Sequence, residues 1–125
     1  MLPVSPSAGG PGTTFVLTLP AAVVRNADAG ADLNVDITPP AGTSRSRCAP
    51  YRLPNARFSG TGDRRSARFL LRPALLRKGA TGWCRGVYRV VAYAETIVID
   101  DEQTGEGGTF DDDLGRATFR VRRGA

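Results

Sequence analysis

Histidine is absent from this 125-residue chain, and methionine, tryptophan, cysteine and lysine are scarce. Without histidine, the chain lacks the commonest general base near neutral pH and the commonest metal ligand, and it cannot form a Ser-His or Cys-His catalytic pair. Long apolar runs are also absent, because Arg, Asp, Gly or Pro interrupts each one short of the roughly 18 residues that a membrane helix needs. The sequence therefore excludes most hydrolytic mechanisms and predicts no membrane span and no cofactor.

The composition is that of one ordinary globular domain, with 41% hydrophobic and 23% charged residues. Residues 1–12 hold three Pro and three Gly, which predicts a flexible N-terminal segment. Residues 13–125 are expected to form a single domain. Because residues 1–12 lack the basic start and apolar core of a secretory signal, either a signal was removed upstream of Met1 or the protein is not exported.

Charge is segregated along the chain, whose net charge is +5. Residues 45–89 contain eleven Arg and Lys78 against one acid, whereas residues 100–113 contain seven acids and no base. The Arg residues alternate with apolar ones, as in Arg89-Val90, which is typical of the solvated outer face of a sheet. No DNA- or RNA-binding motif accompanies them, so nucleic acid is not the expected partner. The alternative is a basic face that binds an anionic polymer by releasing its counterions.

Apolar and polar residues alternate with a period of two along much of the chain, and turn residues separate the runs. No segment keeps the spacing of a long amphipathic helix. The run at residues 83–99 is apolar on much of both faces, which predicts a central strand. About seven strands with almost no helix predict an all-β protein, an antiparallel β-sandwich. The expected strands are 15–19, 33–37, 46–53, 56–59, 67–71, 83–99 and 117–121, with a helical turn at 74–79 and an acidic loop at 100–113.

Cys48 and Cys84 are the only cysteines, and they lie in two different expected strands. An inter-strand disulfide that crosses between the two sheets fits both positions and implies an oxidising compartment. Two reduced thiols are the alternative. A zinc site is disfavoured, because the chain has no His and no Cys-x-x-Cys pair.

Two motifs in the second half of the chain resemble a known group of domains. Residues 82–90 read Gly-Trp-Cys-Arg-Gly-Val-Tyr-Arg-Val, and residues 114–121 read Leu-Gly-Arg-Ala-Thr-Phe-Arg-Val. The pair is similar to the W-C-x-G-x-Y strand and the final G-r-x-x-F-x-V strand of small secreted immunoglobulin-like domains from GC-rich, actinobacterial-type bacteria. The resemblance implies an immunoglobulin-like (Ig-like) β-sandwich in which Cys84 joins an earlier strand, matching Cys48, and Tyr88 packs in the core.

The motif departs from that of an antibody domain, in which Trp lies between the two cysteines and Tyr lies two residues before the second. Here Trp83 adjoins Cys84 and Tyr88 follows it. The resemblance therefore implies an Ig-like architecture without antibody-type recognition loops. From the residues themselves, Gly86 is expected to relieve crowding beside the disulfide, and the Tyr88 hydroxyl needs a hydrogen-bond partner.

The acidic loop at 100–113 is the main candidate for ligand chemistry. Its carboxylates are hard oxygen ligands of the kind that calcium prefers, but the residue order of an EF-hand is missing. A solvated loop is the competing interpretation. Because successive residues of an extended chain point to alternate sides, at most Asp111 and Asp113 would converge. The calcium candidates are Asp100, Asp101, Asp111 and Asp113.

Tyr93 shares the more polar face of its expected strand with Arg85 and Arg89, which makes these three residues the candidate interface. Trp83 is expected to pack in the core beside the disulfide. Catalysis by paired carboxylates would not need His, but a sandwich of this size leaves little material for a substrate cleft. We therefore do not expect an enzyme.

These patterns predict a secreted or cell-surface domain with a non-catalytic, structural or adhesion-type role. The first alternative is a module that binds an anionic glycan or polymer through an Arg-rich face, and binding that is lost at moderate salt would favour it. A calcium-binding β-sandwich domain is the second. An intracellular protein with reduced cysteines and a nucleic-acid partner is the third. The sequence predicts neither the identity of a protein or polymer partner nor the oligomeric state.

Overall fold

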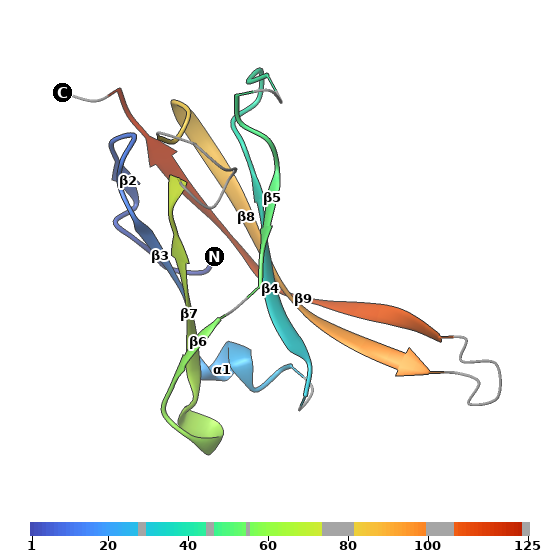
Figure 1. Cartoon of the computed structure of the whole chain (residues 1–125). Coiled ribbons are helices and arrows are strands. Elements are labelled where there is room, and N and C mark those ends of the chain that lie inside the picture. The colour runs from blue at the N-terminus through green and yellow to red at the C-terminus, as the bar shows by residue number, and fades with distance from the viewer. Residues whose placement is uncertain (28–29, 45–46, 55, 74–81, 100–106, 124–125) are drawn as a thin grey trace.

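The computed structural model describes residues 1–27, 30–44, 47–54, 56–73, 82–99 and 107–123. These residues are mostly β-structure and form two sheets (Figure 1). Sheet A has the strand order β1-β3-β7-β6, and sheet B has the order β2-β9-β8-β4-β5. The strands are β1 (Val4–Ser5), β2 (Ala8–Gly9), β3 (Phe15–Leu19), β4 (Asp32–Thr38), β5 (Tyr51–Leu53), β6 (Arg57–Ser59), β7 (Ser66–Leu71), β8 (Gly86–Ile99) and β9 (Gly107–Val121), with a short helix α1 (Ala21–Val24) and a 3-10 turn at Gly62–Arg64.

The all-β prediction is confirmed, but the strands number nine rather than about seven. Strand β3 matches its predicted bounds, and its side chains alternate between buried and half-buried as the sequence period requires. The expected strand at 46–53 is reduced to β5, since Pro50 cannot donate a hydrogen bond to a ladder. The short helix α1 follows Pro20 and was not expected, and the helical turn predicted at 74–79 lies outside the described residues.

The two additional strands, β1 and β2, lie within residues 1–12, the segment that we expected to be flexible. Strand β1 pairs antiparallel with β3 in sheet A, and β2 pairs parallel with β9 in sheet B. The Leu2 side chain is buried, and its backbone N–H donates to the Arg116 carbonyl at 2.8 Å. Leu2 packs on Gly115, where a Cβ atom would lie only 2.9 Å from the Leu2 side chain. The segment is thus tied to both sheets.

A single hydrophobic core is shared by both sheets. Phe15 of sheet A stacks on Phe119 of sheet B with ring centroids 4.2 Å apart, and Phe119 also stacks on Tyr88 at 5.0 Å. Trp83 closes the group by meeting these rings edge-on. These rings are almost completely buried, so the aromatic cluster holds the two layers together.

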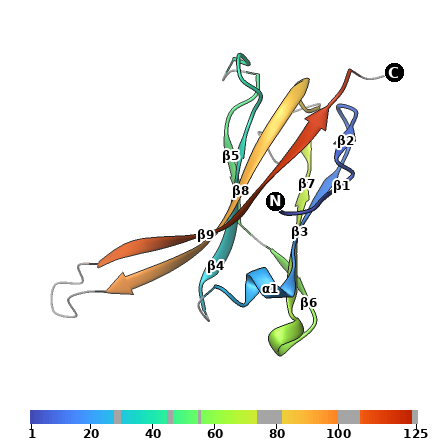
Figure 2. The ribbon, with the colours of Figure 1, turned by 180° about the vertical axis from the view of Figure 1, so that it is seen from behind.

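Strands β8 and β9 form a long hairpin that projects from the rest of the molecule (Figures 1 and 2). Strand β4 pairs with β8 only as far as the Asp32–Glu95 pair, so beyond it the described part of β8 is paired with β9 alone. We call this projecting ribbon, residues 96–99 and 107–110, the arm. The predicted acidic loop at 100–113 is therefore wrong for residues 107–113, because pairing with β8 extends β9 through sequence that has low intrinsic β propensity.

No helix in the described part of the chain has the length and apolar character needed to cross a membrane.

Candidate functional site

The Cys48–Cys84 disulfide is confirmed, with the two Cα atoms 6.4 Å apart. Both cysteines lie just outside strands, so the prediction of an inter-strand link is wrong: the bond joins the loop before β5 to the segment before β8. Strands β5 and β8 belong to the same sheet, so the expected link across the two sheets is also wrong: the bond ties the β4–β5 connection to the segment that leads into β8. The physical reason lies in the flanking residues, because Pro50 and Gly86 limit how far the strands can extend toward the cysteines.

Tyr88 connects the disulfide to the core. Its hydroxyl accepts a hydrogen bond from the Cys84 backbone N–H at 2.9 Å and lies 3.5 Å from the Cys48 sulfur, toward which it donates. Burial raises the pKa of Tyr88, and the Cys84 N–H partly offsets this effect because it stabilises the phenolate. The expectation that this hydroxyl needs a partner is confirmed.

Gly86 relieves crowding against a different neighbour from the one expected, whereas Trp83 lies where it was predicted. Gly86 has φ +131°, and a Cβ atom there would lie 2.7 Å from the Cβ of Pro40, so it relieves crowding against Pro40 rather than against the disulfide. The Trp83 indole N–H donates to the Thr13 carbonyl at 2.7 Å, and the ring is 4% exposed. Trp83 therefore packs in the core, as predicted.

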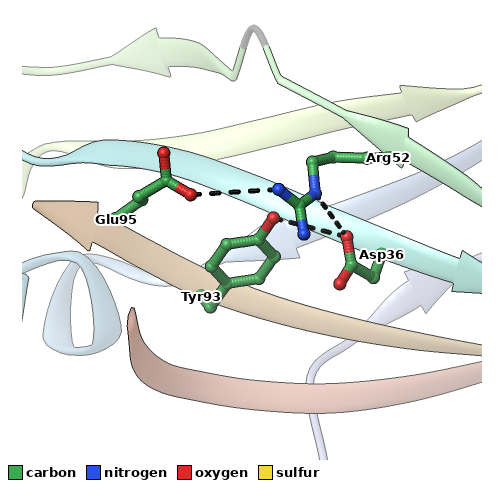
Figure 3. Close-up of polar contacts among 4 residues, drawn as sticks. All are labelled: Asp36, Arg52, Tyr93 and Glu95. Atoms are coloured by element: carbon green, nitrogen blue, oxygen red, sulfur yellow. Dashed lines mark hydrogen bonds and ion pairs between the residues drawn. The ribbon is translucent and has the colours of Figure 1, made fainter. Parts of the chain in front are cut away.

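A polar cluster lies on the outer face of sheet B, opposite the core (Figure 3). Arg52 of β5 is its centre: its Nε is 3.0 Å from Asp36 Oδ1, and its Nη1 is 3.9 Å from Glu95 Oε2. The Tyr93 hydroxyl lies 3.3 Å from the same Asp36 oxygen, and the guanidinium sits over the Tyr93 ring, 5.3 Å from its centroid. Cross-strand pairing explains the meeting, since Asp36 lies opposite Arg52 in the β4–β5 ladder.

The prediction that Tyr93 is an exposed interface residue is wrong. Its side chain is 5% exposed, because Arg52 covers the ring from a strand that is two positions away in the sheet. Burial is the main cause that raises the pKa of Tyr93 to about 12, and the negative charge of Asp36 adds to it. The Arg52 charge acts in the opposite direction.

We predict a pH-dependent loss of stability from this tyrosine. Because the folded-state pKa is raised from 10.0 to about 12, the protonated phenol stabilises the fold fully below pH 10, and this stabilisation is lost as the pH rises toward about 12. Unfolding in urea, measured at a series of alkaline pH values, should show a steeper loss of stability in wild type than in Tyr93→Phe. Parallel pH profiles for the two proteins would contradict the assignment.

A groove of about 560 Å³ opens beside the polar cluster. Arg52 and Glu95 line one part of it, and Phe58 and Asn34 line others. Asn34 is 6% exposed, and within the described residues its side-chain amide has no hydrogen-bond partner. Asn34 lines the groove, so water that enters the groove can hydrogen-bond to this amide.

The other predicted interface residues, Arg85 and Arg89, are exposed. Arg89 pairs across the ladder with Thr118 on the outer face of sheet B, whereas Arg85 precedes the strand. The basic residues do not form a single face, because Arg57 and Arg68 lie opposite each other in the β6–β7 ladder of sheet A. The Arg-rich stretch of the sequence is thus divided between the two sheets.

The calcium candidates are placed only in part. Asp111 and Asp113 lie in β9 opposite Glu95 and Tyr93, and they share a face as predicted, whereas Asp100 and Asp101 lie outside the described residues. Asp113 is already engaged, because its Oδ1 accepts the Gly115 N–H at 2.9 Å. Across the residues that the structure describes, no three Asp, Glu, His or Cys side chains come together as a metal site would need.

Sequence reasoning missed Asp36, Arg52, Glu95 and Asn34 as parts of one site. A weak signal was present, since Asp36 lies at a polar position of an expected strand and Arg52 lies in the next expected strand. Alternation alone assigns both residues to solvent, and only the strand register brings them together. No protein-family model, curated protein or solved structure matches the chain.

Proposed function

We propose that this chain is an Ig-like β-sandwich module of an exported protein, with a structural or adhesion-type role and no catalytic one. The strand order supports the architecture: β1-β3-β7-β6 corresponds to the A-B-E-D sheet of immunoglobulin domains, and β9-β8-β4-β5 corresponds to G-F-C-C′. Strand β2 adds to the outer edge of β9. The shared core between the sheets is the arrangement that such a sandwich requires.

The disulfide differs from that of antibody domains, where the bond joins strands B and F. In this chain those strands correspond to β3 and β8, and the space between them is filled by aromatic rings, with Phe15 of β3 against Phe119 and Trp83. The bond between Cys48 and Cys84 instead lies at the edge of the core, next to Tyr88. We therefore propose an Ig-like architecture only, and we do not propose that the domain binds through antibody-type loops.

The disulfide also supports the proposed location outside the reducing cytosol. Structural disulfides persist in oxidising compartments and are rare in the cytosol, where thiols are kept reduced. The described cysteines are both bonded, and Cys48 is 2% exposed, which protects the bond from exchange with small thiols. A buried structural disulfide of this kind therefore supports the proposal that the module is exported.

The observation that carries the binding role is the arm. Ile97 is 72% exposed and Phe110 is 62% exposed, on a ribbon that extends beyond the body of the protein (Figure 2). Large apolar side chains on a projecting element are favourable when a partner covers them. An adhesion-type module uses such an element to reach its partner.

The proposed location is tested by immunofluorescence on cells that express the full-length native gene. An antibody raised against the folded domain should label intact cells or detect the domain in the culture medium. A matched antibody against a cytosolic protein provides the control, since it should label cells only after permeabilisation. If the domain too is reached only after permeabilisation, the proposed role is contradicted.

A further inference from the structure

The groove beside the polar cluster combines a buried amide with an exposed aromatic ring. It extends from Asn34 and Arg52 of sheet B to Phe58 of sheet A, at the point where the chain passes from β5 to β6. Its volume of about 560 Å³ falls within the roughly 300 to 1,000 Å³ of sites that hold small ligands. The groove is therefore large enough to be a binding site.

Asn34 is the residue that indicates a polar ligand. Its neighbours in β4, Leu33 and Val35, pack in the core, so the Asn34 side chain lies on the other face of the strand, where it lines the groove. It is 6% exposed, and no group of the described residues hydrogen-bonds to its amide. Because an amide has N–H donors and a carbonyl acceptor, a matching ligand both accepts and donates hydrogen bonds.

The charged residues of the groove favour a ligand without net charge. Asp32 and Glu95 lie opposite each other in the β4–β8 ladder, and both line the groove. Arg52 lines it too, held between Asp36 and Glu95 (Figure 3). An anion would meet the two carboxylates, and a cation would meet the guanidinium and compete with it for Glu95. A hydroxyl group is neutral, and it can accept from the guanidinium or donate to a carboxylate.

Phe58 gives the groove an apolar surface. The residue is 47% exposed, and the Arg65 guanidinium lies over its ring at 4.3 Å from the centroid. Pro54 and Ala56 add further apolar surface to the lining. A few placed polar groups beside apolar surface is the usual composition of a small-ligand site. Such a lining fits a ligand that has C–H groups on one face and hydroxyls around its edge.

We propose that this groove binds a neutral sugar residue of a glycan. The hydroxyls of a sugar ring donate and accept hydrogen bonds, which matches Asn34 and the charged residues, and its C–H groups form an apolar face, which matches Phe58. Water can hydrogen-bond to the amide, but it does not cover the aromatic ring. The inference goes beyond the role proposed above, because the lining of the groove includes neither Ile97 nor Phe110 of the arm.

NMR titration of the ¹⁵N-labelled chain with neutral disaccharides tests the proposal. Maltose and cellobiose represent polysaccharides, and N-acetyllactosamine represents the glycans of glycoproteins, so the pattern of response separates these two sources. At least one of them should shift the Asn34 side-chain NH₂ signals, with a dissociation constant on the order of 1 mM or tighter. If none of them shifts these signals at about 20 mM, the proposal is overturned.

Charged probes test the choice of a neutral ligand. Galacturonic acid supplies a sugar with a carboxylate, and free arginine supplies a cation. Both should bind more weakly than the best neutral disaccharide, because each meets a like charge in the groove. Tighter binding of either one at Asn34 would overturn the assignment to a neutral sugar.

Asn34→Leu separates an amide that binds a ligand from one that stabilises the fold. Because the amide has no partner among the described residues, its removal breaks no hydrogen bond there, and the free energy of unfolding in urea should stay the same or rise. The affinity for the sugar, followed on the backbone amides of β4, should fall roughly tenfold or more. A less stable variant that binds the sugar as wild type does would overturn the proposal.

Phe58→Ala and Phe110→Ala form a matched pair of variants. Both rings are exposed, at 47% and 62%, so neither change should unfold the protein. Phe58→Ala should weaken sugar binding roughly tenfold, because the apolar face of the sugar loses its contact, whereas Phe110 lies outside the groove and its replacement should have no effect. Equal affinities of the two variants would overturn the proposed contact.

The sugar titration and the test of location fail independently. Absence of sugar binding would remove this inference and leave the labelling of intact cells unaffected. Conversely, sugar binding by a domain that is found only in the cytosol would retain this inference and remove the exported role.

Discussion

Replacing Phe119 with alanine is expected to lower the free energy of unfolding by about 4 kcal/mol. Phe119 is 1% exposed and lies between Phe15 and Tyr88, with Trp83 at its edge. The substitution removes a buried ring and leaves a cavity between the two sheets, which neighbouring rings cannot fill without leaving their own positions. Since a whole domain is stable by only about 5 to 15 kcal/mol, the loss is large.

Equilibrium unfolding in urea measures this effect, and Phe110→Ala is the matched control. Phe110 lies in the same strand but is 62% exposed, so its replacement should change the free energy of unfolding by no more than about 0.5 kcal/mol. Similar losses for the two variants would mean that the aromatic cluster is not the joint between the sheets.

Removal of the disulfide should destabilise the protein by a similar amount. The double variant C48A/C84A opens a loop that joins residues separated by 36 positions, and the loop-entropy estimate for such a closure is about 4 kcal/mol. Tyr88 loses the neighbouring sulfur but keeps the backbone N–H of position 84 as a partner, so the core itself should remain ordered.

Reduction of the wild-type protein provides a second measurement of the same quantity. Wild type unfolded in the presence of a strong dithiol reductant should approach the midpoint of C48A/C84A, whereas the double variant should not respond to the reductant. An oxidised wild type no more stable than the double variant would show that the bond does not restrain the unfolded chain.

The sequence predicted those strands in which burial alternates along one element. Phe15, Leu17 and Leu19 form such a run, and so do Ala67, Phe69 and Leu71, because each inward position is apolar and each run ends at a proline. The inward side chains of these two strands are all completely buried in the core. Their pairing into sheets then follows from the antiparallel register.

The other strands could not be predicted, because they form only by pairing with strands that lie far away in the sequence. Strands β1 and β2 are two residues long and sit among prolines and glycines, so no period can identify them, and only their pairing with β3 and β9 defines them. Strand β9 continues through residues 111–113 because these residues pair with β8. In both places tertiary pairing overrides local preference.

The same reason accounts for the error on Tyr93. Its position on the outer face was predicted, but its burial depends on Arg52, which is 41 positions away and reaches the ring across β4. A long Arg side chain can cover an aromatic ring while its charge stays near water. Period-two patterns report which face a residue occupies, and they do not report what lies over that face.

The central claim is a two-sheet domain that carries a covalent bond between Cys48 and Cys84 and works outside the reducing cytosol. Its most direct test is the intact mass of the protein isolated from its own cells, with free thiols blocked by an alkylating reagent at lysis. We expect one unalkylated species, lighter than the dithiol form by the hydrogens lost on oxidation. A species that carries an alkyl group on both cysteines would contradict the claim.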